Sequence, residues 1–224
     1  IRDRSPSRGL GDVYKRQDAD REALLSGMKA GGVGMIVDAA ATVASWDKIL
    51  ELTEKYPFDL VIGSSHVVNG IDPYYPAFYK GKTEHEAYTE YFESILDNLH
   101  SGADFDVYGH IDYVVRYGPD KNKYYSYEKY ADIIDAILKE IISQGKGIEL
   151  NTAGFKYGLG HPNPTEAVLK RYHELGGEII TVGADAHKPE HVAYDFDKVS
   201  NILKDAGFMY YTVFENRVPA FIKL

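Results

Sequence analysis

Histidine and acidic residues recur in this sequence where short apolar runs end. The positions are His66 after DLVIGSS, His110 after DVYG, Glu149 and Asn151 late in GIELN, and Asp185 and His187 at the end of IITVGADAH. Imidazole nitrogens and carboxylate oxygens are donors with which proteins bind zinc, manganese or iron. Asp185 and His187 give the strongest local signal, because residues two apart in an extended chain point to the same side. The pattern therefore predicts a site for divalent metal ions.

The prediction rests on the joint pattern, since a single histidine is more often packed in a core or loop than bound to a metal. Four other histidines fall in expected helices or loops and are interpreted as surface residues: His85, His100, His173 and His191. His161, in the glycine-rich loop YGLGHPNP, fits either interpretation.

The composition narrows the chemistry further. The 224 residues contain no cysteine, which excludes disulfides, thiolate metal sites and cysteine nucleophiles. The formal net charge of -9 gives no electrostatic footprint for nucleic acid, although a small basic pocket can still bind a small anionic substrate. No apolar run reaches the roughly 18 residues that span a bilayer, so we expect a cytoplasmic protein with no membrane partner. The sequence does not indicate an oligomeric state.

Helical and extended patterns alternate along the chain and must position these side chains. The expected strands cover residues 59–68, 104–115, 147–154, 178–187 and 208–215, the last followed by a short apolar tail. Between them lie expected helices from the Thr83–Glu86 capping box to about Gly102, from Ser126 to Gly145, from Thr165 to Leu175 and from about Phe196 to Gly207. Such alternation predicts an α/β fold whose parallel sheet closes, or nearly closes, into a barrel. In these barrels the active site lies at the carboxyl ends of the strands.

The N-terminal part of the sequence lacks this regularity. Residues 1–17 are basic and polar with no helical or strand period, so we interpret them as a non-native segment. Residues 18–45 are rich in alanine and glycine and offer little volume for a core. We therefore expect one domain, residues 18–224, whose true N-terminus has been lost.

Four segments resemble the later motifs of histidinol phosphatases of the PHP (polymerase and histidinol phosphatase) family. They are IGSSHVVNGIDPYY, VYGHIDYVVRYGP, GIELNTAGFKYGLGHPNP and ELGGEIITVGADAHKPE, and the resemblance covers about residues 46–224. It implies a distorted (β/α)7 TIM-like barrel lacking its first strand or strands. It also implies two or three divalent ions, zinc, manganese or iron, held by His66, His110, Asp185 and His187. The family's opening HxH pair has no counterpart here, and Asp38 stands where the glutamate of its GIE-like strand is expected.

The resemblance also implies an activity, the hydrolysis of a small phosphate monoester, L-histidinol phosphate, in histidine biosynthesis. Asp185 and His187 would be the catalytic residues, with Asp185 orienting the attacking hydroxide. Arg116 and Lys156 lie just beyond two of the strands and would bind the phosphate; the alternative for each is a solvated loop cation. Another PHP-type phosphoesterase and an inactive truncated remnant are the competing interpretations. Because the HxH pair and the glutamate are absent, we expect this chain to be inactive or nearly so.

Overall fold

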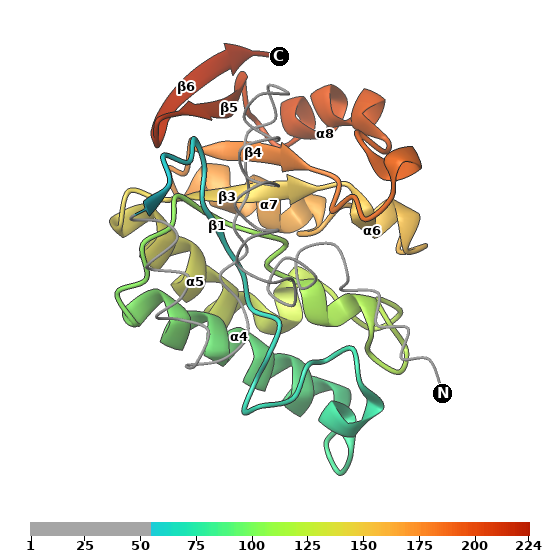
Figure 1. Cartoon of the computed structure of the whole chain (residues 1–224). Helices are drawn as coiled ribbons and strands as arrows, with labels where there is room; N and C mark the ends of the chain where they lie inside the picture. The colour runs from blue at the N-terminus through green and yellow to red at the C-terminus, as the bar shows by residue number, and fades with distance from the viewer. Residues whose placement is uncertain (1–54) are drawn as a thin grey trace.

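The computed structural model describes residues 55–224, so the segments 1–17 and 18–45 and Asp38 lie outside the described residues. Its central feature is a four-stranded parallel sheet with the order β1-β2-β3-β4 (Figure 1). The strands are β1 (Ile62–Gly63), β2 (Val107–Tyr108), β3 (Gly147–Asn151) and β4 (Ile180–Gly183). The predicted α/β class with a parallel sheet is confirmed, whereas closure of the sheet into a barrel stays a prediction.

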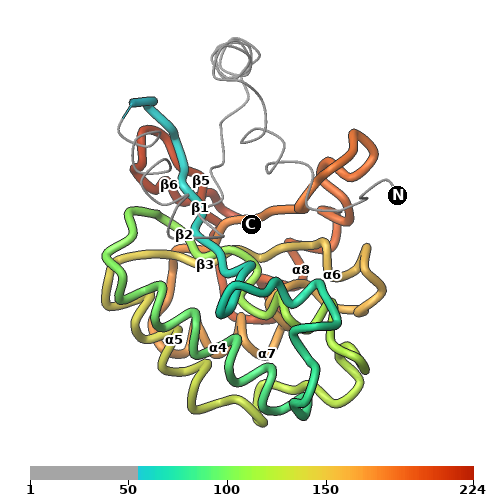
Figure 2. The backbone as a smooth tube through the Cα atoms, turned by 60° about the horizontal axis from the view of Figure 1, so that its bottom comes forward, coloured from blue at the N-terminus to red at the C-terminus, as the bar shows by residue number. Residues whose placement is uncertain are grey.

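The helices follow the strands in alternation, as a parallel sheet requires. They are α4 (Glu84–His100), α5 (Ala131–Ser143), α6 (Ala153–Lys156), α7 (Glu166–Glu174) and α8 (Val199–Asp205). Helices α4, α5 and α7 lie side by side along one face of the sheet (Figure 2). None of the described helices is long and apolar enough to cross a membrane.

The predicted start of α4 is confirmed, whereas α5 begins later than predicted. The capping box before α4 is present, because Thr83 Oγ1 accepts from the Glu86 backbone while Glu86 Oε2 accepts from the Thr83 backbone. Ser126 makes no side-chain cap, and the chain first forms a 3-10 turn, Tyr127–Tyr130, before α5 begins. The predicted helix therefore starts about one turn later as an α-helix.

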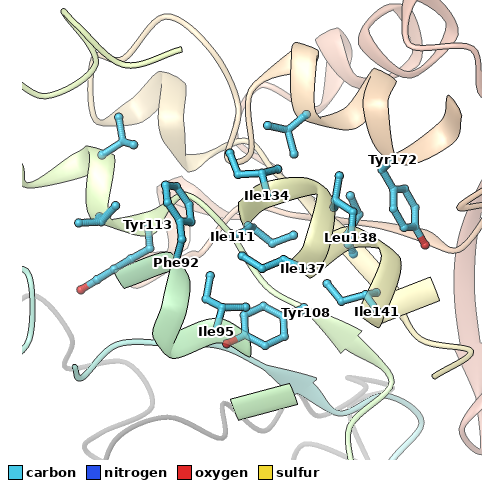
Figure 3. Packing of buried hydrophobic residues seen from close by; sticks show 14 of the residues in the cluster. Phe92, Ile95, Tyr108, Ile111, Tyr113, Ile134, Ile137, Leu138, Ile141 and Tyr172 are labelled. Carbon is cyan, nitrogen blue, oxygen red and sulfur yellow. The ribbon is translucent and has the colours of Figure 1, made fainter. Parts of the chain in front are cut away.

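A continuous apolar core fixes the sheet against its helices. From α5 the side chains of Ile134, Ile137, Leu138 and Ile141 are fully buried, at the i, i+3, i+4 spacing of one helical face (Figure 3). They pack in one cluster with α4, β2 and β3, including Phe92, Ile95, Tyr108 and Ile148. Burying a side chain of this size stabilises the fold by about 1.5–3 kcal/mol. The core thus holds the strand ends in a fixed frame.

The C-terminal residues form an antiparallel hairpin of β5 (Tyr210–Glu215) and β6 (Val218–Lys223). The sequence-based interpretation of β6 as an apolar tail is therefore wrong. Five of the six β6 residues are exposed, so the strand has no alternation of buried and exposed residues that its sequence could reveal. The hairpin joins the sheet where the Ile180 N–H donates to Thr212 Oγ1 at 3.1 Å, and its turn reaches back to Asp59 before β1.

Candidate active site

The two histidines that follow β1 and β2 face each other. His66 Nε2 and His110 Nε2 lie 3.2 Å apart, and the two rings stack with centroids 5.0 Å apart and planes at 11°. The Tyr113 ring also stacks on His66, with centroids 4.6 Å apart. The parallel register places β1 and β2 as neighbours, with Gly63 opposite Tyr108, so their carboxyl ends meet. Two of the predicted metal ligands are thus adjacent.

The environment of His110 favours its neutral form. The residue is buried with a positive φ of 27°, a conformation that few non-glycine residues adopt. Burial, followed by the charges of Arg116 and His66, holds its pKa well below the usual range. Neutral imidazole is the form that binds metal ions. Its Nδ1 is buried without a hydrogen-bond partner among the described residues.

Asp185 follows β4 and is tied to a buried arginine. Arg116 Nη1 donates to Asp185 Oδ2 at 2.7 Å, and the Arg116 side chain has no exposed surface. Burial raises the pKa of the Asp185 carboxyl, but the charges of Arg116, His110 and His187 outweigh burial and hold that pKa well below its usual range. Asp185 also has a positive φ, 47°. The carboxylate is therefore ionised, and its Oδ2 is the oxygen that the arginine engages.

His187 is oriented by the same residue. Its Nδ1 donates to the Asp185 carbonyl oxygen at 2.9 Å and lies 3.6 Å from Asp185 Oδ1. In a neutral imidazole this leaves the Nε2 lone pair for a metal ion, the arrangement that backbone partners commonly impose on histidine ligands. The predicted pair Asp185 and His187 is therefore held together by local bonds.

Two asparagines complete the surroundings of Arg116. Its Nε donates to Asn163 Oδ1 at 2.8 Å and its Nη2 to Asn151 Oδ1 at 3.4 Å, while the guanidinium lies 5.6 Å from the Tyr113 ring and 5.1 Å from the Tyr157 ring. Asn151 was predicted from the sequence as a strand-end residue, whereas Asn163 was not. Its only signal was a place in the loop YGLGHPNP, next to the ambiguous His161.

Asn163 in turn contacts Asp112, which the sequence pattern does not predict either. The Asn163 Nδ2 donates to Asp112 Oδ1 at 2.5 Å, and the Thr165 backbone N–H donates to Asp112 Oδ2 at 3.1 Å. Asp112 is fully buried, and burial raises its pKa despite the opposing effects of His161, Asn163 and Thr165. The His161 Nδ1 donates to the Pro162 carbonyl oxygen at 2.6 Å. His161 is therefore held by its own loop, close enough for its charge to lower the pKa of Asp112.

Glu149 in β3 is a second buried carboxyl beneath the site. Its Oε2 accepts from the His110 backbone at 3.2 Å and from Asn151 Nδ2 at 2.9 Å. Burial raises its pKa to about 7, and the nearby Asp185 charge acts in the same direction. On β4 the register places Thr181 opposite Glu149 and Gly183 opposite Asn151. A Cβ atom at Gly183 would lie 1.9 Å from Glu149 Oε1. A larger residue there would displace the carboxyl.

Lys156, at the end of α6, reaches the same strand end. Its Nζ donates to the carbonyl oxygens of Ala184 at 3.3 Å and Asp185 at 3.0 Å. Burial lowers its pKa. Arg116 and Lys156 therefore both contact the Asp185 segment, and neither is a solvated loop cation.

The described residues supply two pairs of metal-binding side chains, His66 with His110 and Asp185 with His187, but no complete coordination shell. Within residues 55–224, no group of three or more His, Asp or Glu side chains is arranged around one ion. The 3.2 Å between the His66 and His110 nitrogens nevertheless fits a shared ion, because two nitrogens bound tetrahedrally to zinc at about 2.0–2.1 Å lie about 3.3 Å apart. The donor chemistry thus fits part of a metal site.

The remaining histidines divide into two kinds. His85 and His100 are exposed, as predicted. His173 and His191 are half-buried and each has a buried Nδ1, so their interpretation as surface residues is wrong. His173 is covered because its ring packs on Phe208 at 4.7 Å, a contact between α7 and the start of the hairpin that sequence spacing does not reveal.

Comparisons with known proteins identify relatives of this chain. A histidinol-phosphatase from Lactococcus lactis is 32% identical over 162 residues, which cover 72% of this chain and 60% of the relative. A relative from Clostridium acetobutylicum, named as a probable histidinol-phosphatase, is 36% identical over 155 residues, covering 69% and 59%. The chain thus spans about three fifths of the length of these relatives.

A solved structure supports the fold. The crystal structure of histidinol phosphate phosphatase from Lactococcus lactis, complexed with zinc, L-histidinol and phosphate, matches with a TM-score of 0.74 and 27% identity. The match covers 94% of this chain and 79% of the other. The model of the PHP domain family matches residues 3–153, a range that includes most of the segment 1–17. Because that range is more than half of the sequence, the chain belongs to the PHP domain family.

Proposed function

We propose that the site is that of a metal-dependent phosphate monoester hydrolase acting on L-histidinol phosphate. The observation that carries the proposal is the approach of His66 and His110 to 3.2 Å at the same strand ends as the Arg116–Asp185 pair. The relatives named as histidinol-phosphatases support the reaction, and the Lactococcus lactis complex with zinc, L-histidinol and phosphate supports the substrate class and the metal. We further propose that the parallel sheet is part of a distorted (β/α)7 barrel formed by residues 18–224.

His66, His110, Asp185 and His187 are proposed to hold the divalent ions. When bound, such ions neutralise charge on phosphoryl oxygens and supply, near neutral pH, a water acidic enough to yield a nucleophile. The chain contributes the correct donor states: a neutral His110, an ionised Asp185 and a His187 whose Nδ1 is already engaged. No proton must be removed from His110 or Asp185 before metal binding.

Arg116 and Lys156 are proposed to bind the phosphate. Three of the five N–H groups of Arg116 are engaged by Asn163, Asp185 and Asn151, and the other two are assigned to phosphoryl oxygens. Its full burial means that these groups act in a dry environment, where charge-assisted bonds are strong. Lys156 adds a second cation beside Asp185.

The test is hydrolysis of L-histidinol phosphate after removal of metal with a chelator and after return of zinc, manganese or iron. We expect phosphate release that requires the ion and is faster for L-histidinol phosphate than for glycerol phosphate. The Lactococcus lactis enzyme is the reference, and turnover well below it would support the expectation of a nearly inactive chain. Binding of no zinc, or equal phosphate release with chelator present, would contradict the proposal.

A further inference from the structure

The buried residues behind the site form a directed chain of hydrogen bonds. It runs from Asp112 through Asn163 and Arg116 to Asp185, with distances of 2.5, 2.8 and 2.7 Å. Asp112, Asn163 and Arg116 are each no more than 3% exposed. Asp112 itself lies behind the proposed ligands, where it bonds to Asn163 and Thr165. It can therefore act on the site only through its neighbours.

The direction of this chain is set by the Asn163 amide. One end of that amide donates and the other accepts. Asp112 Oδ1 accepts from Asn163 Nδ2 and Asp112 Oδ2 accepts from the Thr165 N–H, which leaves Asn163 Oδ1 for Arg116 Nε. Turning the amide over would place two donors together at Arg116 and two acceptors together at Asp112. With both oxygens accepting, Asp112 thus selects one of the two orientations.

The position of the Arg116 guanidinium depends on the orientation of the Asn163 amide. Its Nε bond to Asn163 is 2.8 Å, whereas its bond to Asn151 is 3.4 Å, so Asn163 is the stronger side-chain amide contact. The Tyr113 and Tyr157 rings contact the guanidinium without a directional bond, so its hydrogen bonds set its position, and the Nε bond to Asn163 is one of them. That position directs Nη1 at Asp185 Oδ2 and leaves Oδ1 for a metal ion.

We propose that Asp112 is a positioning residue of the site, which orients Asn163 so that Arg116 holds Asp185 in its metal-binding position. The inference rests on the proposed function for its substrate, but the buried contacts carry it independently. The competing explanation is a local one, that Asp112 only secures the start of α7 through its bond to the Thr165 N–H.

An exchange of acid and amide separates the two explanations. In Asp112→Asn, the new amide oxygen can serve either Asn163 or Thr165, and its NH2 meets the other donor. In Asn163→Asp, two carboxylates face each other. The double variant, D112N with N163D, restores every pairing: the amide introduced at position 112 accepts from Thr165 and donates to the carboxylate introduced at position 163, which accepts from Arg116. Thr165→Pro removes the Thr165 N–H bond to Asp112 and leaves the Asn163 bond in place, and the φ of -59° at Thr165 suits proline.

Zinc affinity of the chelator-treated protein, measured by calorimetry, is the main readout, with kcat and KM for L-histidinol phosphate beside it. We expect each single exchange to weaken zinc binding by about 10–100-fold, the usual effect of removing a residue that orients a ligand. The double exchange should recover most of the loss, and Thr165→Pro should keep the wild-type affinity even if it unfolds at lower temperature. Unchanged affinity in Asp112→Asn, no recovery in the double exchange, or an equal loss in Thr165→Pro would overturn the proposal.

A metal-free measurement decides the inference even if the proposed function fails. If the wild-type chain neither binds zinc nor hydrolyses the ester, that function is rejected. Urea unfolding of Asp112→Asn, Asp185→Asn and the variant that combines these two substitutions then measures their coupling, since residues of one network are not additive. Non-additive losses in the free energy of unfolding support the coupling of Asp112 to Asp185 through the hydrogen-bond chain, whereas strictly additive losses reject it.

Discussion

Two arginines at opposite ends of the parallel sheet pair with aspartates in contrasting surroundings. Arg116, at the carboxyl ends of the strands, has no exposed side-chain surface and bonds Asp185 and two asparagine oxygens. Arg217, in the β5–β6 turn, bonds Asp104 and Asp106 at the other end of the sheet and keeps 27% of its side chain exposed. The hairpin that carries Arg217 lies beside β4 (Figure 1), and its turn bonds Asp59 in the segment before β1.

The two arginines therefore have different roles: Arg116 belongs to the candidate active site, and Arg217 attaches the β5–β6 hairpin to the sheet. A buried ion pair gains little net stability, because both charges lose water, yet removing one partner leaves the other uncompensated. A partly exposed pair is screened and contributes about 0–1 kcal/mol. The same residue types therefore serve to hold a charged group in place in one region and to fasten a hairpin in the other.

The largest expected effect is that of Arg116→Ala. It leaves the half-buried Asp185 carboxylate and the buried Asn163 Oδ1 without their Arg116 donor, so we expect a loss of about 3–5 kcal/mol in the free energy of unfolding. Hydrolysis of L-histidinol phosphate should fall below detection. Urea unfolding and a phosphate-release assay measure the two effects. Arg217→Ala is the matched control, and equal losses from both substitutions would remove the contrast.

Gly183→Ala tests how rigid the site region is. The added Cβ would lie 1.9 Å from Glu149 Oε1, and Glu149 is held by the His110 backbone and Asn151. Displacing it should cost about 1–3 kcal/mol, as overpacking in a filled core does. Combining Gly183→Ala with Glu149→Ala should remove the clash, so the two losses should not add. Additive unfolding losses would show that Glu149 moves aside freely.

The candidate site and the hairpin also differ in how much of their structure the sequence predicts. His66, His110, Asp185 and His187 were predictable as a group, because each closes an apolar run and parallel strands bring such ends together. Asp112 and Asn163 were not, because they lie 51 residues apart and gain meaning only through a contact that no local period encodes. The α4 capping box was readable for the opposite reason, since its two residues lie three apart. The hairpin was missed because its second strand is largely exposed.

Arg217 affects the stability of the hairpin in two ways, through its ion pairs and through the strain of its backbone conformation. It has a positive φ of 66°, after Asn216 with 51°, a turn that favours glycine at the second position. Arg217→Ala removes the bonds to Asp104 and Asp106 and should cost about 1 kcal/mol or less, with phosphatase activity unchanged. Arg217→Gly removes the same bonds but relieves roughly 1 kcal/mol of backbone strain, so it should be the more stable variant. Equal melting temperatures for the two variants would refute the strain.

The smallest expected effect concerns a third pair, on the outer helices. Arg171 on α7 donates to Asp135 on α5, with its Nη2 2.6 Å from Asp135 Oδ2, and Tyr127 adds a further bond. The Arg171 hydrogen bonds hold the pKa of Asp135 below its usual range, with burial opposing. Because the folded pKa is the lower one, the stabilisation is complete above the ordinary aspartate value of about 3.9 and is lost as pH falls through the folded value.

Asp135→Asn should therefore lower the free energy of unfolding slightly at pH 7, and the difference from wild type should shrink as the pH falls below about 4. Salt should shrink it as well, since the Arg171 side chain is 32% exposed and screened by solvent ions. Urea unfolding at several pH values, at low and high salt, measures both trends. A difference that stays constant from pH 7 to pH 3 would mean that Asp135 stabilises the helix pair by packing, and that its charge has no part in it.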